Sequence, residues 1–148
     1  MLSLRALRKA GFKKCAAWSL DDSGKPQVLG SLPPEPGVYL FVVGSKIHYV
    51  GKADDSLQKR LRRYAGAMRR DERSRPVHKG IDKELASGRC VDIYAFPQAN
   101  RLHQQKGLPL DLVVGLEAGL IETLDPDWNP YNSKGRKKRA SLSVPVKT

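Results

Sequence analysis

The sequence predicts an α/β protein of the α+β type, with a small central antiparallel sheet flanked by helices. Residues 38–43 and 47–52 are rich in β-branched and aromatic residues. They are separated only by Gly44-Ser45-Lys46, which is typical of a β-hairpin. Residues 91–96 have a similar composition and supply a third strand, whereas the apolar spacing of residues 112–124 indicates a helix.

Two further helices are expected between the hairpin and the third strand. Residues 56–70 place apolar side chains on one face and basic side chains on the others, with Asp55 or Ser56 as the N-cap. Residues 78–87 form the second of these helices, before Gly88. The polar segment 97–110 shows no strand or helix pattern.

The length favours one domain with terminal extensions, because 148 residues with 40% hydrophobic content are enough for one hydrophobic core and too few for two well-formed domains. Residues 1–35 are expected to be an N-terminal lead-in packed on the domain, with a helix over 2–14 followed by a loop. The domain itself spans residues 36–132. Residues 133–148 form a basic C-terminal tail that is expected to be flexible.

The charge balance predicts a polyanionic partner. The chain has 27 Lys and Arg against 15 Asp and Glu, a net charge of +12, and a pI near 10. Such a field attracts phosphates, so nucleic acid is the first candidate and an anionic membrane is the rival. The longest continuous apolar run, residues 38–43, is far too short to span a bilayer, which counts against a membrane partner.

Localisation is expected to be cytoplasmic, in a protein of bacterial or phage type. Basic residues interrupt the apolar N-terminal stretch and break up any signal-peptide core. A transit peptide is the alternative, because no acidic residue precedes Asp21. Cys15 and Cys90 lack metal-ligand spacing, so the sequence suggests neither a disulfide framework nor a zinc module.

Glu117 is the most informative single residue. It lies in the middle of the apolar stripe of the predicted helix 112–124, whereas Glu122 lies on the opposite side. A carboxylate in an apolar stripe needs a cation, a metal ion or strong hydrogen-bond donors, because burying an unpaired charge is costly. An ion pair with an arginine and a metal site are equal alternatives on this pattern alone.

Five short motifs follow one another over residues 36–132. They are Gly37-Val38-Tyr39, Tyr49-Val50-Gly51-Lys52, Leu57 through Arg60 and Tyr64, Leu116-Glu117 with Leu120-Ile121, and Pro126 with Trp128-Asn129. Each motif alone is weak, but in this order they resemble the GIY-YIG nuclease family over about two thirds of the chain. The resemblance implies a GIY-YIG endonuclease-like fold.

The resemblance also implies a divalent-metal-dependent endonuclease that hydrolyses DNA phosphodiester bonds by in-line attack of activated water. Glu117 would hold one Mg²⁺ or Mn²⁺ ion, a hard cation that prefers oxygen ligands. Arg60 would clamp the scissile phosphate, because its planar guanidinium matches phosphate geometry. Lys52 would add positive charge there. Asn129 would fix local structure beside the site.

Three tyrosines complete the implied catalytic set. Tyr39 is the first choice to orient or deprotonate the attacking water, with nearby Arg60 and the metal favouring its phenolate. Tyr49 is the alternative base or a hydrogen-bonding partner of Tyr39. Tyr64 would contact phosphate or water. Without the motifs, Tyr39 and Tyr49 are interpreted as strand packing residues.

DNA is the expected partner, with RNA left open as a substrate and no membrane expected. A protein partner or a homodimer for targeting is also left open. Two rival hypotheses are a non-catalytic nucleic-acid-binding module on a nuclease fold and a basic structural or ribosome-associated protein. Phosphate contacts are predicted for the cations Lys52, Arg63, Arg69, Arg70, Lys134, Arg136, Lys137, Lys138 and Arg139.

The implied site constrains the register of the hairpin. A plain two-residue Gly44-Ser45 turn would pair Leu40 with Tyr49 and place Tyr39 and Tyr49 on opposite faces of the sheet. A three-residue loop, or a bulge that gives the same shift, would pair Phe41 with Tyr49 and bring both tyrosines to one face. We therefore expect one of these two arrangements, with the site on one face of the sheet.

Overall fold

A computed structural model describes residues 2–66, 69, 72 and 75–130. Predictions for Arg70 and for the tail residues Lys134, Arg136, Lys137, Lys138 and Arg139 lie outside these residues. The elements are α1 (Leu4–Ala10), β1 (Lys13–Leu20), β2 (Pro26–Gly30), β3 (Gly37–Val43), β4 (Lys46–Ala53), α2 (Leu57–Ala65), α3 (Arg75–Ala86), β5 (Val91–Pro97), β6 (Leu102–Gln105), β7 (Leu108–Asp111) and α4 (Leu112–Leu124).

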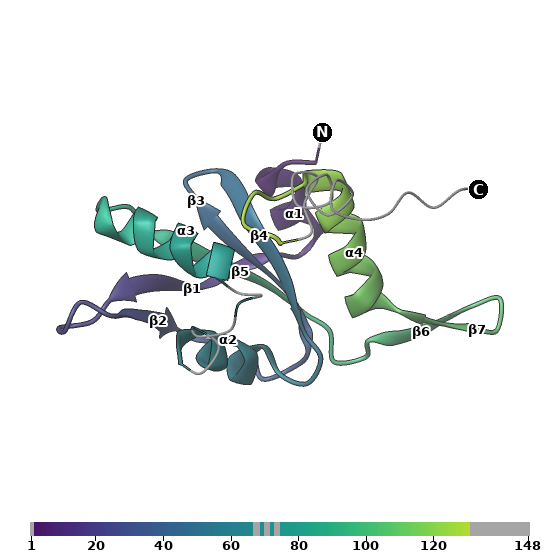
Figure 1. Cartoon of the computed structure of the whole chain (residues 1–148). Coiled ribbons are helices and arrows are strands. Elements are labelled where there is room, and N and C mark those ends of the chain that lie inside the picture. Colours follow the sequence, from purple (N-terminus) through teal and green to yellow (C-terminus); the bar gives the residue numbers. More distant parts are fainter. Residues whose placement is uncertain (1, 67–68, 70–71, 73–74, 131–148) are drawn as a thin grey trace, which may run out of the picture.

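The predicted antiparallel sheet is confirmed, and it has five strands in the order β2-β1-β5-β3-β4 (Figure 1). One face packs against α2 and α3, and the other packs against α1 and α4. β3 lies inside the sheet and is buried on both sides, which explains its nearly continuous apolar sequence. β4 is an edge strand, so one row of its backbone groups faces away from the sheet.

The N-terminal region differs from its predicted helix and loop. Helix α1 ends at Gly11, whose φ of 127° is readily adopted only by glycine, and the chain then enters β1. β1 and β2 pair with each other, and β1 also pairs with β5. These strands were missed because β1 has few β-branched residues, although Ala16 and Trp18 alternate into the core.

The register of β3 and β4 is the one expected to unite the tyrosines. Val43 pairs with Lys46 across a two-residue turn, but a bulge in β4 shifts the register so that Phe41 pairs with Tyr49. The extra residue is His48. Tyr39 and Tyr49 consequently lie in the same core cluster, on the face covered by α2 and α3. The bulge, not a three-residue loop, achieves the shift.

The polar segment 97–110 contains a second, two-stranded sheet made by β6 and β7. Figure 1 shows this hairpin extending away from the five-stranded sheet. Its turn includes Lys106 and Gly107, both at positive φ. Leu102 pairs with Asp111, which is also the N-cap of α4, so the hairpin leads directly into that helix.

The predicted helix 112–124 is confirmed with the same bounds. Helix α2 begins after Ser56, one of the two predicted caps, whose side chain accepts a hydrogen bond from the Lys59 amide. Within the described residues, no helix is long and apolar enough to cross a membrane.

Candidate active site

Several of the predicted site residues lie around the end of β4, where α2 begins on one side of the sheet and α4 runs along the other. A hollow of about 340 Å³ lies there. Its lining residues are Lys52, Asp54, Asp55, Ser56, Arg60, Arg63 and Glu117. The site therefore draws on both faces of the sheet at its edge, which corrects the expectation that it would occupy one face.

Strand pairing fixes the position of Tyr39. It pairs with Gly51 across β3 and β4, and a methyl group at Gly51 would overlap the Tyr39 ring. Gly51 therefore leaves space for the phenol to lie over the neighbouring strand. Tyr39 is fully buried, and its hydroxyl is among the buried polar atoms of the described residues that have no hydrogen-bond partner.

Tyr49 and Tyr64 form a pair of phenols beside Tyr39. Their hydroxyl oxygens lie 2.5 Å apart, and both side chains are buried. The Tyr39 ring centroid lies 6.0 Å from that of Tyr49 and 6.1 Å from that of Tyr64. The three tyrosines are thus neighbours, with Tyr64 supplied by α2. Among the described residues Tyr49 is hydrogen-bonded to Tyr64 and not to Tyr39, which the sequence had offered as its partner.

The guanidinium of Arg60 lies beside these tyrosine rings. Its guanidinium carbon lies 5.3 Å from the centroid of the Tyr64 ring, within the range of a cation–π contact. Its Nε atom is buried without a hydrogen-bond partner in the described part of the chain. The guanidinium is close enough to Tyr39 to interact with its hydroxyl, but no well-aligned hydrogen bond joins the two.

Burial raises the pKa of Tyr39 well above its ordinary value, and the neighbouring phenols of Tyr49 and Tyr64 raise it further. Arg60 acts in the opposite direction but does not reverse the shift. Burial likewise raises the pKa of Tyr49. Arg60 thus acts on Tyr39 in the expected direction, but burial outweighs it, and the neutral phenol is favoured in the free protein.

Glu117 reaches the hollow from the middle of α4. The helix buries Val113 and Leu120 on the sheet, and this anchoring leaves Glu117 half-buried at the edge. Among the described residues, no hydrogen bond and no ion pair within 4 Å is formed by its carboxylate. Burial raises the pKa of Glu117, Asp54 adds to the rise, and Lys52 and Arg60 partly offset it.

The arginine ion pair that the sequence left open as one of two alternatives for Glu117 is therefore not formed within the described chain. Both Lys52 and Arg60 are near enough to influence its charge, but neither neutralises it by direct contact. Lys52 instead donates to both carboxylate oxygens of Asp54 at 2.8 Å. A half-buried carboxylate that retains its acceptor capacity beside two cations has the electrostatic character of a site for a cation and a phosphate.

Asn129 closes the open edge of β4. Its side-chain amide donates to the Val50 carbonyl at 2.8 Å and accepts from the Val50 amide at 3.0 Å. The Trp128 amide donates to the His48 carbonyl, so this segment continues along the same edge. Asn129 thereby holds the backbone between Tyr49 and Gly51, in keeping with its predicted local role.

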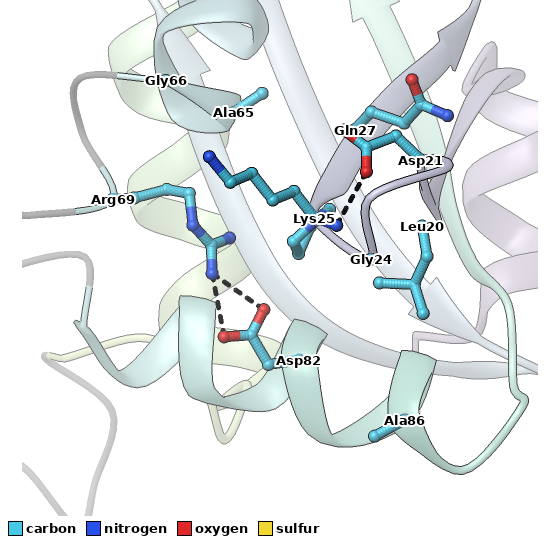
Figure 2. Close-up of a pocket in the computed structure, with 11 residues that line it drawn as sticks. Leu20, Asp21, Gly24, Lys25, Gln27, Ala65, Gly66, Arg69, Asp82 and Ala86 are labelled. Atoms are coloured by element: carbon cyan, nitrogen blue, oxygen red, sulfur yellow. Dashed lines mark hydrogen bonds and ion pairs between the residues drawn. The ribbon is translucent and has the colours of Figure 1, made fainter.

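A larger hollow, of about 930 Å³, lies elsewhere in the molecule. It is formed by the β1–β2 turn, the end of α2 and the side of α3 (Figure 2). Arg69 belongs to this hollow, where it donates to both oxygens of Asp82 at 3.0 and 2.9 Å. The structure thus places Arg69 apart from Glu117 and gives it an intramolecular partner, whereas Arg63 lines the smaller hollow.

Three polar residues at the site were not singled out from the sequence. Asp54 lines the hollow, and Arg101 binds both Asp54 and the helix cap Asp111. The Asp-Asp-Ser sequence before α2 signals a helix start but not this network. Arg101 carried no local signal, because its partners lie 47 and 10 residues away.

Sequence comparisons identify two curated relatives. The chain is 34% identical over 134 residues to UvrABC system protein C of Natronomonas pharaonis, covering 79% of this chain and 23% of that protein. It is 33% identical over 132 residues to the protein of the same name from Haloarcula marismortui, covering 72% and 22%. The chain thus spans less than a quarter of the length of these relatives. No protein-family model matches it.

Structural comparisons agree on the fold. A mutant of bacteriophage T4 EndoII matches with a TM-score of 0.68 and 22% identity, covering 84% of this chain and 96% of that one. The restriction endonuclease HPY188I in complex with product DNA matches with a TM-score of 0.50 and 16% identity, covering 97% and 84%. With the ordered motifs, the sequence relatives and this shared fold, the chain belongs to the GIY-YIG nuclease family.

Proposed function

We propose that this protein is a divalent-cation-dependent endonuclease that hydrolyses DNA phosphodiester bonds at the hollow lined by Lys52, Arg60 and Glu117. The observation that carries the proposal is the half-buried Glu117, which has no ion-pair partner among the described residues yet lies near Lys52 and Arg60. A module that only bound phosphates would gain nothing from an uncompensated carboxylate beside those cations. The same carboxylate serves hydrolysis if it binds a cation together with the scissile phosphate.

The donor set fits Mg²⁺ or Mn²⁺ held by one protein carboxylate. No group of three or more His, Cys, Asp or Glu side chains suited to a metal is found in the described chain. A hard cation of this type is commonly held by one or two carboxylates, with water and substrate oxygens completing its shell. Glu117 is the proposed ligand, since Asp54 is occupied by Lys52 and Arg101. When bound, such a cation stabilises charge on the phosphate and favours ionisation of water.

Arg60 is proposed to bind the scissile phosphate. Arg60 is half-buried and its Nε atom is fully buried, and this partial exclusion of water strengthens the attraction of the guanidinium for an anion. Its unpartnered Nε leaves a donor for a phosphate oxygen in the bound state. Lys52 and Arg63 line the same hollow and are proposed to contact the phosphate backbone, as their positive charge favours.

Tyr39 is proposed to orient the attacking water as a neutral phenol. The raised pKa disfavours a phenolate in the resting protein, whereas the free hydroxyl retains its capacity to form a hydrogen bond with water. The Tyr49 and Tyr64 hydroxyls bind each other and support the rings beside Tyr39. Asn129 is proposed to support this arrangement by holding β4.

DNA is proposed as the substrate and partner. The net charge of +12 favours a nucleic acid. One of the structural neighbours is a restriction endonuclease in complex with product DNA. The proposal concerns phosphodiester hydrolysis in DNA and includes no assignment of a preferred sequence or branched structure.

Cleavage of DNA with and without Mg²⁺ tests the proposal. Purified wild type, Glu117→Gln and Glu122→Gln are incubated with supercoiled, linear and branched DNA, and strand breaks are counted on denaturing gels. Glu122 is the matched control, because it lies on the same helix but is exposed. We expect Mg²⁺-dependent breaks with wild type and Glu122→Gln, and none above background with Glu117→Gln.

The contrary results are equally specific. DNA binding by wild type without any Mg²⁺- or Mn²⁺-dependent cleavage would favour the non-catalytic binding module. Equal cleavage by wild type and Glu117→Gln would remove Glu117 from the mechanism. Cleavage of RNA but not of matched DNA would support phosphodiester hydrolysis and would contradict the assignment of DNA as the substrate.

A further inference from the structure

Arg101 joins its own segment to Asp54, which lines the hollow, and to Asp111, which caps α4. Its Nη1 donates to the Asp54 backbone carbonyl at 2.7 Å, and its Nη2 donates to the Asp54 carboxylate at 3.0 Å. On the other side, its Nη2 donates to Asp111 at 2.9 Å, and its Nε lies 3.2 Å from both oxygens of the same carboxylate. The planar guanidinium can satisfy both sides at once, which a lysine ammonium cannot do with the same geometry.

Asp111 connects this network to α4. One of its carboxylate oxygens accepts hydrogen bonds from the Val113 and Val114 amides and thereby caps the helix. The Leu112 amide also donates to the Arg101 carbonyl at 2.7 Å. Both the side chain and the backbone of Arg101 therefore hold the first turn of the helix.

Glu117 lies six residues after this cap on the same helix, roughly 9 Å along its axis. A rotation or shift of the first turn would be transmitted to Glu117, because a helix of 13 residues moves largely as one body. Asp54 is the complementary anchor, since it lines the hollow and binds Lys52. The network thus links Asp54, which lines the hollow, to α4, which supplies Glu117 to the same hollow.

We infer that Arg101 is a positioning residue that sets the distance of Glu117 on α4 from Lys52 and Arg60 by bridging Asp111 and Asp54. This inference rests on the proposed function, because the groups it positions are those proposed to hold the cation and the phosphate. The charges of Lys52, Asp54, Arg101 and Asp111 balance within the network. Glu117 therefore remains uncompensated by these ion pairs.

The competing explanation is that Arg101 only stabilises the helix cap. Two variants separate the alternatives. Arg101→Gln removes both ion pairs, whereas Asp111→Asn keeps a good N-cap side chain but weakens the link to Arg101. Arg89→Gln is the matched control, because it removes an arginine–glutamate pair with a separation of 3.3 Å at the end of α3.

The experiment measures single-turnover DNA cleavage against Mg²⁺ concentration, at a temperature where every variant is fully folded. For Arg101→Gln we expect a rate at saturating Mg²⁺ reduced by about 10- to 100-fold and a higher half-saturating Mg²⁺ concentration. Asp111→Asn should shift both quantities in the same direction by less. The double variant should be no worse than Arg101→Gln, since both changes break one network. Arg89→Gln should match wild type.

Hydrogen exchange of the free protein gives a readout that does not require activity. Peptides covering residues 108–118 should exchange faster in Arg101→Gln than in wild type, whereas Arg89→Gln should leave them unchanged. Wild-type cleavage and wild-type Mg²⁺ dependence in Arg101→Gln would overturn the inference. Losses that multiply in the double variant would also overturn it, because the two residues would then act independently.

The Glu117→Gln control separates this inference from the proposed function. If wild type cleaves and Glu117→Gln does not, the proposed function stands and the Arg101 variants test only the positioning role. If wild type does not cleave under any condition, the proposed function fails, and hydrogen exchange alone reports whether Arg101 holds α4.

Discussion

The two hollows of this protein differ in size and in whether their charged side chains have partners within the fold. The second difference distinguishes them chemically. The larger one, shown in Figure 2, contains Arg69 and Asp82 in direct contact. Its second carboxylate, Asp21, accepts hydrogen bonds from Ser23 and Lys25 within the β1–β2 turn. Both carboxylates there are satisfied by the fold itself.

The smaller hollow contains groups that the fold leaves unsatisfied. Glu117 has no ion-pair partner among the described residues, and the Nε atom of Arg60 is buried without a hydrogen-bond partner in the same part of the chain. The Tyr39 hydroxyl is likewise buried without a partner there, although Tyr39 does not line the hollow. Unpaired buried groups destabilise a protein, so a cation without a partner and a carboxylate without a partner in one hollow favour binding of a species that completes both. Volume alone would favour the larger hollow, whose two carboxylates already have partners within the fold.

Replacement of Glu117 tests this difference between the hollows most directly, and it has the largest expected effect. We expect Glu117→Gln to lower single-turnover cleavage by about a thousandfold or more, because loss of cation-assisted catalysis removes several kcal/mol of stabilisation. The same change should stabilise the metal-free protein at neutral pH. Since burial raises the pKa of the folded carboxyl, the native state binds more protons than the unfolded state above the ordinary value of 4.5, and stability falls there as pH rises.

This stability effect is measured as the urea unfolding midpoint in EDTA at pH 4 and pH 7.5. The advantage of Glu117→Gln should be larger at pH 7.5 and should shrink toward pH 4, with Glu122→Gln following wild type. A destabilised Glu117→Gln at pH 7.5 would indicate that the carboxylate makes a favourable contact in the free protein.

Removal of the Tyr39 hydroxyl is the next largest expected effect. Tyr39→Phe keeps the ring over Gly51 and should lower cleavage by about a hundredfold, within the usual range for a group that positions or transfers a proton. Because the phenol is proposed to act while neutral, the variant should retain the wild-type dependence of rate on pH between pH 6 and 9. If wild-type activity rose with pH and that rise vanished in Tyr39→Phe, Tyr39 would be the general base instead.

Gly51→Ala tests whether the ring of Tyr39 must occupy its observed position. The added methyl group overlaps the Tyr39 ring and forces one of the two strands to shift. We expect about 1–3 kcal/mol of destabilisation, typical of overpacking, and about a tenfold loss of cleavage. Thermal unfolding and single-turnover cleavage are measured for Gly51→Ala and for the control Gly44→Ala. The methyl group added at Gly44 would meet nothing within 4 Å, although the alanine would have to adopt the positive φ of that position. Unchanged cleavage in a stably folded Gly51→Ala would show that ring placement is not critical.

The smallest catalytic effect is expected in the larger hollow. Arg69→Gln removes the ion pair with Asp82, so it should lower the unfolding midpoint while leaving cleavage within about threefold of wild type. Cleavage and unfolding are measured on the same preparation. A loss as large as the hundredfold expected for Tyr39→Phe would return Arg69 to the DNA-contacting set and weaken the distinction between the hollows.

Local sequence determined much of the scaffold. Apolar side chains at helical spacing specified α4, because a helix at the surface must bury one face, and this required only neighbouring residues. The same pattern identified Glu117 as an exception within that face. The ordered motifs then indicated which other residues accompany it, namely Tyr39, Tyr49, Arg60, Tyr64 and Asn129.

Tertiary structure decided how these residues meet. The bulge at His48, the pairing of Asn129 with Val50 and the bridge made by Arg101 depend on partners that are distant in sequence or on a choice between alternative registers. β1 was missed for a related reason, since its pairing with β5 compensates for a weak local strand signal. Tertiary packing also sets the direction of the Tyr39 pKa shift, because the burial created by the whole core outweighs the nearby charge of Arg60.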